Sequence, residues 1–183
     1  AINVAVFLVG IITEFLSGRN LPREFGILDK TLVAQGEYWR LFTAMFLHGD
    51  LAHLFGNMYF LYILGRNFTK QYSTGRFLAL YFLSGLAGSL LSCALSSYRS
   101  LGASGAIMGL GGALIYKIFF GKHKTYFRHM GNYMSLGFMV LFNLGYGLFN
   151  AGIDNYGHFG GFFCGSTGKS SASPASYASQ CAR

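Results

Sequence analysis

The chain has 183 residues, of which 52% are hydrophobic and 11% are charged, and its mean hydropathy is +0.41. A soluble domain carries about a quarter charged residues, so the composition excludes an ordinary soluble domain and indicates a membrane protein. The formal charge of +8 could suggest a nucleic-acid partner, but the basic residues gather in short links between apolar segments, so we expect no nucleic-acid surface.

Six apolar segments are predicted to be membrane helices, because about 20 apolar residues are needed to cross a bilayer core. In chain order they cover residues 1–16, 51–65, 77–95, 101–120, 133–153 and 155–165. The first could be the apolar part of a signal peptide, but it lacks a basic leader and five further segments follow it. Since residue 1 is Ala and not Met, we expect a trimmed N-terminus. The predicted fold class is all-α, a polytopic six-helix bundle.

The sixth segment is short, and the chain after it changes character. Residues 155–165 would span roughly 16 Å as a helix, about half the hydrocarbon thickness. Residues 166–183 are polar and rich in serine, and we expect them to be disordered or non-native, as after a frame change, a fusion or a truncation. The sequence thus predicts a transmembrane domain over residues 1–165 with a truncated sixth helix, and a low-complexity tail over 166–183.

The distribution of Lys and Arg predicts the orientation of the helices, since cytoplasmic links are enriched in these residues. The links after the second and fourth segments contain basic residues and no acid: Arg66, Lys70, Arg76, Lys117, Lys122, Lys124 and Arg128. The link after the first segment mixes both signs, and the link after the third holds a single arginine. We therefore place the links after the second and fourth segments in the cytoplasm and the links after the first and third segments outside.

This topology gathers unusual polar residues at one depth. Segments two, four and six all run inward, so their first turns lie together just below the outer surface. Those turns contain His53, Asn57, Ser104 and His158. Polar and ionisable residues inside a membrane are costly and usually functional, so a functional site is predicted near the outer face.

Ser104 and His158 are a candidate nucleophile and base, because a serine hydroxyl reacts only when a neighbouring base accepts its proton. Glycines follow each of them along its helix, and glycine-faced membrane helices pack closely. These glycines are Gly109 and Gly112 in one segment and Gly161 and Gly165 in the other. We expect this packing to bring the hydroxyl within hydrogen-bond reach of the imidazole. Asp154, just before the last segment, is expected to be its N-cap.

His53 and Asn57 lie four residues apart and share one helical face. Both can donate hydrogen bonds. With the backbone N–H of Ser104 they could form the oxyanion hole that acyl transfer requires.

Taken together, Gly102-Ala103-Ser104-Gly105-Ala106, His53-xxx-Asn57, Gly157-His158-xx-Gly161 and Trp39-Arg40 resemble the rhomboid family of intramembrane serine proteases over about residues 1–165. The resemblance implies that Ser104 is the nucleophile, His158 the general base, and His53 and Asn57 the oxyanion donors. It implies supporting roles for Gly102, Gly105, Gly161 and His48, the last holding the outer link. It further implies cleavage of transmembrane segments near their outer ends within a lipid bilayer, and neither cofactor nor metal.

One position departs from the family pattern, and other functions remain open. Many members carry an aromatic residue where this chain has Met108, and a thioether can also pack against a ring. The alternatives are a catalytically inactive relative that binds membrane helices and, less favoured, a small-solute channel. A zinc protease is not expected, because the HExxH motif is missing at His53. We interpret Trp39 and Arg40 as anchors at the bilayer interface.

Overall fold

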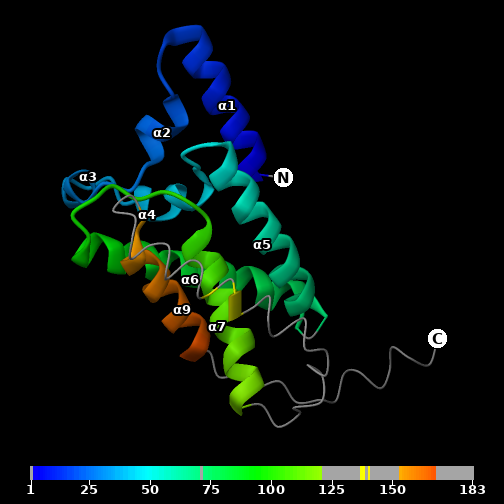
Figure 1. The fold of residues 1–183 in the computed structure, drawn as a ribbon. Coiled ribbons are helices and arrows are strands. Elements are labelled where there is room, and N and C mark those ends of the chain that lie inside the picture. The colour runs from blue at the N-terminus through cyan, green and yellow to red at the C-terminus, as the bar shows by residue number, and fades with distance from the viewer. Residues whose placement is uncertain (1, 71, 121–136, 139, 141–152, 168–183) are drawn as a thin grey trace.

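The computed structural model describes residues 2–70, 72–120, 137, 138, 140 and 153–167. Four long helices and one shorter one shape the described part (Figure 1): α1 (Ile2–Ser17), α5 (Leu51–Thr69), α6 (Thr74–Leu95), α7 (Ser104–Phe120) and α9 (Asn155–Thr167). The link between α1 and α5 contains short helices: α2 (Leu21–Gly26), α3 (Lys30–Ala34), α4 (Arg40–Thr43) and the 3-10 helix η1 (Ala44–Phe46). Within the described residues, β pairing is limited to one isolated bridge between Leu28 and Ser100. The predicted all-helical class is confirmed.

The helix boundaries differ from the predicted segments for local reasons. The second segment continues to Thr69 instead of residue 65, and the third begins at Thr74 because the Ser73 side chain caps it by accepting the N–H of Arg76 at 3.4 Å. The fourth begins only at Ser104, since Gly102 has φ +129° and cannot be helical. The sixth continues to Thr167.

The number of membrane-crossing helices is not fixed by the described residues. Among them α6 is the one helix that is long and apolar enough to cross a membrane, and α1 is apolar but shorter. The predicted fifth segment, 133–153, falls almost entirely outside the described residues, although 137, 138 and 140 are helical. Of the predicted tail, only residues 166 and 167 are described, and they extend α9. The six-helix count and the division at residue 165 therefore stay predictions.

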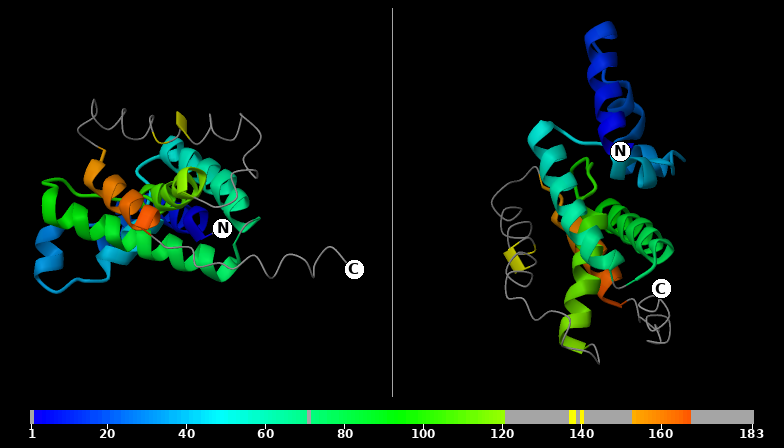
Figure 2. Two further views of the ribbon diagram at one scale, coloured as in Figure 1. Left: turned by 90° about the horizontal axis from the view of Figure 1, so that it is seen from below. Right: turned by 90° about the vertical axis from the view of Figure 1, so that its right-hand side faces the viewer.

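The centre of the bundle is a close contact of α9 with both α6 and α7 (Figures 1 and 2). A Cβ atom on Gly161 or Gly165 of α9 would overlap a backbone carbonyl of α7. On the α6 side, a Cβ on Gly88 would come within 2.5 Å of the Gly157 carbonyl oxygen. The three backbones approach this closely because the contacting positions lack side chains. The predicted glycine contact between α7 and α9 is confirmed, and α6 is a third member that the sequence analysis did not include.

Helix α1 does not lie alongside the other long helices. It projects beyond the bundle with α2 packed against it (Figure 1; right-hand view of Figure 2). Its buried residues are Asn3, whose side-chain amide donates to Met58 Sδ at 3.8 Å, and Gly10, which lies against Asn20. Most large apolar residues of α1 are exposed, and Phe15 is 88% exposed. The side of α1 that packs inward therefore carries Asn3 and Gly10.

Arg40 organises the link between α1 and α5, which we call the outer link (residues 18–50). Its side chain is 3% exposed and donates to the carbonyl oxygens of Glu24 at 3.0 Å and Ile27 at 2.9 Å. It also pairs with Glu37 at 2.6 Å. The interpretation of Arg40 as an interfacial anchor is therefore wrong, because the buried guanidinium satisfies carbonyls that a short irregular link leaves unpaired. Trp39 remains half-exposed and donates to the Phe25 carbonyl at 3.0 Å.

Candidate active site

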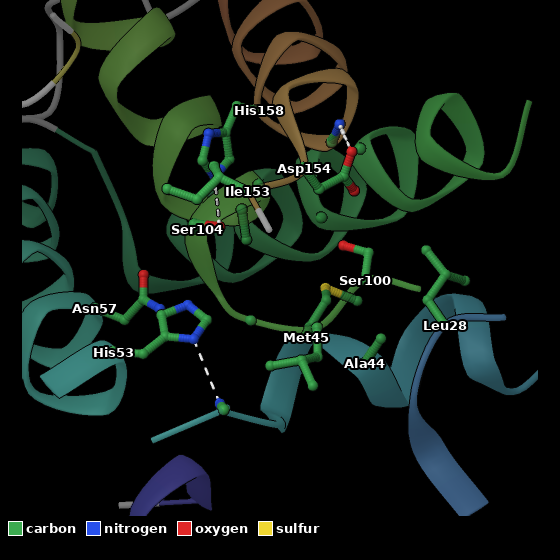
Figure 3. A pocket seen from close by; sticks show the side chains of 18 of the residues that line it. Leu28, Ala44, Met45, His53, Asn57, Ser100, Ser104, Ile153, Asp154 and His158 are labelled. Carbon is green, nitrogen blue, oxygen red and sulfur yellow. Dashed lines mark hydrogen bonds between the residues drawn. The ribbon is translucent and has the colours of Figure 1, made fainter. Parts of the chain in front are cut away.

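A cavity of about 830 Å³ lies where the first turns of α5, α7 and α9 meet (Figure 3). Its lining includes six of the predicted site residues: His53, Asn57, Gly102, Ser104, Gly105 and His158. The predicted convergence of these three helix ends is thus present in the structure. Gly161 lies deeper, at the contact of α9 with α7, and His48 lies behind His53, outside the cavity lining.

Ser104 and His158 are in hydrogen-bond contact across the α7–α9 interface. The Oγ of Ser104 lies 2.8 Å from Nε2 of His158 (Figure 3). The imidazole is 5% exposed, and within the described part of the chain its Nδ1 has no hydrogen-bond partner. When Nδ1 carries the proton, Nε2 can accept the hydroxyl proton of Ser104. The pair therefore has the geometry of a nucleophile and its general base.

The start of α9 is fixed by Asp154, which places His158 in the first full turn. The Asp154 carboxylate accepts the N–H of Gly157 at 2.9 Å, so the predicted N-cap is confirmed. The Asp154 backbone carbonyl accepts the N–H of His158 at 3.2 Å. Gly157 lies against α6 at Gly88 and near Gly105 of α7, where a Cβ would be 3.2 Å from the Gly157 carbonyl oxygen. The cap and these glycines together set the height of the imidazole beside the serine.

Ser104 is the first residue of α7, and this position leaves its backbone N–H without a partner inside the helix. The positive end of the helix dipole lies at the same point. Just before it, the N–H of Gly102 donates to the Ala44 carbonyl at 2.9 Å. A Cβ atom on Gly102 would lie 2.9 Å from the His53 ring. Glycine is thus needed twice at this position, for its positive φ and for the close approach to His53.

His53 and Asn57 present donors to the cavity from α5 (Figure 3). The N–H of Gly49 lies 3.4 Å from His53 Nδ1 and donates to it, which leaves Nε2 of a neutral ring as the protonated nitrogen. Asn57 is 7% exposed, and its side-chain NH₂ has no hydrogen-bond partner within the described residues. A buried amide donor without a partner is costly. Both groups thus offer hydrogen-bond donors to the cavity that Ser104 also lines.

His48, which belongs to the outer link, packs on the ring of His53. The two rings meet edge to face with centroids 5.1 Å apart. His48 is buried, and neither of its ring nitrogens has a hydrogen-bond partner among the described residues. Its supporting contact is therefore with a cavity residue, through ring packing.

Several residues that shape the site were missed by the sequence analysis. Gly85 and Gly88 of α6 line the cavity, and two glycines three residues apart on one helix are a signal of a close helix contact. Ala44 and Leu28 of the outer link give no such signal, because they act through backbone groups. Met108, the departure from the family pattern, is 1% exposed and belongs to the apolar core.

The comparison with known proteins identifies the family. The model of the rhomboid domain matches residues 35–168. The chain belongs to the rhomboid family. Rhomboid protease GluP of Bacillus subtilis (strain 168) is 41% identical over 77% of this chain and 27% of its own length. RHOMBOID-like protein 5 of Arabidopsis thaliana is 39% identical over 83% of this chain and 50% of its own. Rhomboid-like protease 1 of Toxoplasma gondii is 32% identical over 90% of this chain and 60% of its own length.

The chain thus spans between about a quarter and three fifths of the length of these curated relatives. Rhomboid family members are integral membrane proteins. Two of these three relatives are named as proteases.

Proposed function

We propose that this chain is an intramembrane serine endopeptidase that cleaves transmembrane segments of other proteins through a dyad of Ser104 and His158. The observation that carries the proposal is the 2.8 Å contact between Ser104 Oγ and His158 Nε2 at the wall of the cavity. An ionisable residue inside a membrane protein is costly and usually functional, which supports a use for this contact.

In the proposed reaction, Ser104 Oγ attacks the substrate carbonyl carbon while its proton passes to His158 Nε2. The carbonyl oxygen becomes an oxyanion that accepts hydrogen bonds from Asn57 Nδ2, His53 Nε2–H and the backbone N–H of Ser104. The C–N bond then breaks, and His158 returns the proton to the leaving amine. Water next attacks the acyl-enzyme, again with His158 as base, and releases the carboxylic acid product.

The cavity suggests how a substrate fits. Beside Ser104 its lining is made of small residues, among them Gly88, Gly105 and Ala106, which favours small substrate residues next to the cut. Charged groups from the outer link and neighbouring loops line the same cavity, namely Arg23, Asp50, Arg99 and Asp154. These polar groups favour entry of the water that the second step needs. We expect the active site to lie near the outer, non-cytoplasmic face of the membrane.

A catalytically inactive relative that binds membrane helices is the second candidate. The observation in its favour is the polar sequence after residue 165, which shortens the apolar part of the last helix. In such an inactive relative, Ser104 and His158 would remain in contact but would not cleave a peptide bond.

The deciding experiment uses the full chain in lipid nanodiscs with a fluorophosphonate probe and a transmembrane substrate peptide. Wild type is expected to be labelled and to cleave, whereas Ser104→Ala and His158→Ala lose about a thousandfold or more of the rate. Ser92→Ala is the matched control, because Ser92 is a buried α6 serine outside the cavity lining. Absence of labelling in folded wild type, or equal labelling of Ser104→Ala, would reject the protease.

A further inference from the structure

The loop that joins α6 to α7 (residues 96–103) delivers Ser104 to the site, and it is tied to the outer link. The N–H of Leu28 donates to the Ser100 carbonyl at 2.9 Å, and the N–H of Ser100 donates back to the Leu28 carbonyl at 3.0 Å. Two residues later the Gly102 N–H binds the Ala44 carbonyl at 2.9 Å. The loop therefore takes its position from the outer link and not from α6 or α7 alone.

Side chains reinforce the same connection. Arg99 Nε donates to Asp29 Oδ2 at 2.7 Å, across 70 positions of sequence. Lys30 Nζ donates to the Ser96 carbonyl at 3.1 Å. Asp29 is 6% exposed, and its other carboxylate oxygen accepts the N–H of Thr31 at 2.9 Å and also the Thr31 hydroxyl. A carboxylate held from both sides in this way has one orientation.

The charge of Asp29 is permanent over the working pH range. The hydrogen bond from the Thr31 hydroxyl, helped by Arg99 and against the effect of burial, lowers the pKa of Asp29 to about 2. Charge-assisted hydrogen bonds of this kind are stronger than neutral ones. Arg99 thus has an anionic partner at any pH well above 2.

From these contacts we infer that Asp29 and Arg99 form a positioning pair, which holds the 96–103 loop on the outer link and so sets the place of Ser104 and Gly102 in the reaction. This inference rests on the proposed protease function. Arg99 lies five residues before Ser104, and Gly102 between them lies against the His53 ring. A shift of the loop would therefore displace the nucleophile and an oxyanion donor together. A displacement of about 1 Å can cost on the order of a hundredfold in rate.

Two other roles for Arg99 would give different results. Arg99 lines the cavity, so it could instead bind substrate, and its removal would then raise KM and leave kcat unchanged. The pair could also contribute only to stability, and its removal would then lower the melting temperature without changing kcat. The positioning role predicts a lower kcat with KM nearly unchanged, in addition to any fall in melting temperature.

The test uses the full chain in nanodiscs and compares Arg99→Met with Arg99→Lys, Asp29→Asn and the control Arg19→Met. Asn can still cap α3, so Asp29→Asn weakens the ion pair and keeps the cap. Arg19 pairs with Glu24 on the exposed part of the outer link and has no contact with the loop. We expect a ten- to hundredfold loss of kcat and of fluorophosphonate labelling rate in Arg99→Met. Arg99→Lys should recover most of it, and Arg19→Met should match wild type.

Hydrogen exchange of the Ser100 and Gly102 amides provides a readout that does not need activity. Exchange at both is expected to speed up about tenfold in Arg99→Met and to remain unchanged in Arg19→Met, because local opening exposes amides whose tether is lost. Unchanged kcat, a change in KM alone, or unchanged exchange would overturn the inference. If wild type itself shows no labelling, the proposed function fails, and the exchange result still decides whether the pair holds the loop.

Discussion

At Ser104, two features of the backbone would favour the proposed reaction at the hydroxyl. The residue opens α7, so its N–H is unpaired within the helix and the helix dipole places positive potential beside it. The imidazole of His158 is held by burial and by the Asp154 cap. Within the described residues no carboxylate contacts its Nδ1. In the proposed dyad, the packing of α9 would hold the imidazole in place.

The oxyanion donors can be tested one at a time. Asn57→Ala and His53→Ala are each expected to lower kcat about a hundredfold, on the order of 3 kcal/mol of barrier, with little change in KM, because these bonds strengthen only in the transition state. Steady-state cleavage of a transmembrane peptide measures both constants. Thr69→Ala, at the opposite end of α5 and exposed, is the control. A variant of either donor with wild-type kcat would remove that residue from the oxyanion hole.

Asp29 predicts a defined acid dependence of stability. Its pKa is lowered from 3.8 to about 2 by the Thr31 hydroxyl and Arg99, so the folded state favours the carboxylate. The resulting stabilisation is complete above about pH 4 and is lost as the pH falls through about 2. The melting temperature of wild type should exceed that of Asp29→Asn at pH 5, and the gap should close towards pH 2. Glu24→Gln should show a much smaller gap, since its pair with Arg19 is exposed.

Among the helices, α9 is the one whose packing sets the geometry of the candidate site. It carries His158 at one end and meets both α6 and α7 through glycines. Gly161 lies almost one turn below His158, where its backbone touches the Gly105 region of α7. Backbone atoms form this contact. No neighbouring side chain can therefore change its rotamer to make room for a side chain at this position.

Gly161→Ala is therefore expected to push α9 away from α7. The added methyl group would overlap the Gly105 carbonyl oxygen, and overpacking of this kind costs about 1–3 kcal/mol. We expect a lower melting temperature and a fluorophosphonate labelling rate reduced at least tenfold, because the serine and imidazole separate. Gly75→Ala is the matched control, since Gly75 is also helical and a Cβ there meets nothing within 4 Å. Equal labelling by the two variants would show that the α7–α9 distance does not control the dyad.

The sequence predicts the residues that line the site better than it predicts the contacts that hold those residues in place. Ser104, His158, His53 and Asn57 were found because polar residues are conspicuous in apolar segments, and charge asymmetry placed them at one depth. The Arg40 and Arg99 contacts could not be found in the same way. Apart from the local pair of Arg40 with Glu37, their partners are backbone carbonyls or an acid 70 positions away. Nothing in a local pattern specifies which distant group an arginine will meet. The position of α1 is equally hidden in the sequence, because most of its large apolar residues are exposed and do not pack against the bundle.

For the whole molecule, the arrangement of the helices makes the orientation in the membrane testable. The end of the bundle that holds the cavity is also the end from which the outer link departs. The opposite end holds the turn between α5 and α6, where Arg66, Lys70 and Arg76 occur without an acid. Basic links of this kind remain in the cytoplasm, so Ser104 should face the other side.

Cysteine labelling in intact bacterial cells can measure this orientation. In a chain whose three native cysteines, Cys93, Cys164 and Cys181, are replaced by Ala, a single cysteine is introduced at Phe25 or at Thr74, both exposed. Phe25→Cys, in the outer link, should react with a membrane-impermeant maleimide in intact cells. Thr74→Cys, at the start of α6, should react only after permeabilisation, because the basic turn beside it stays inside. The reverse pattern would place the cavity at the cytoplasmic face, and substrates would then have to be cut near their inner ends.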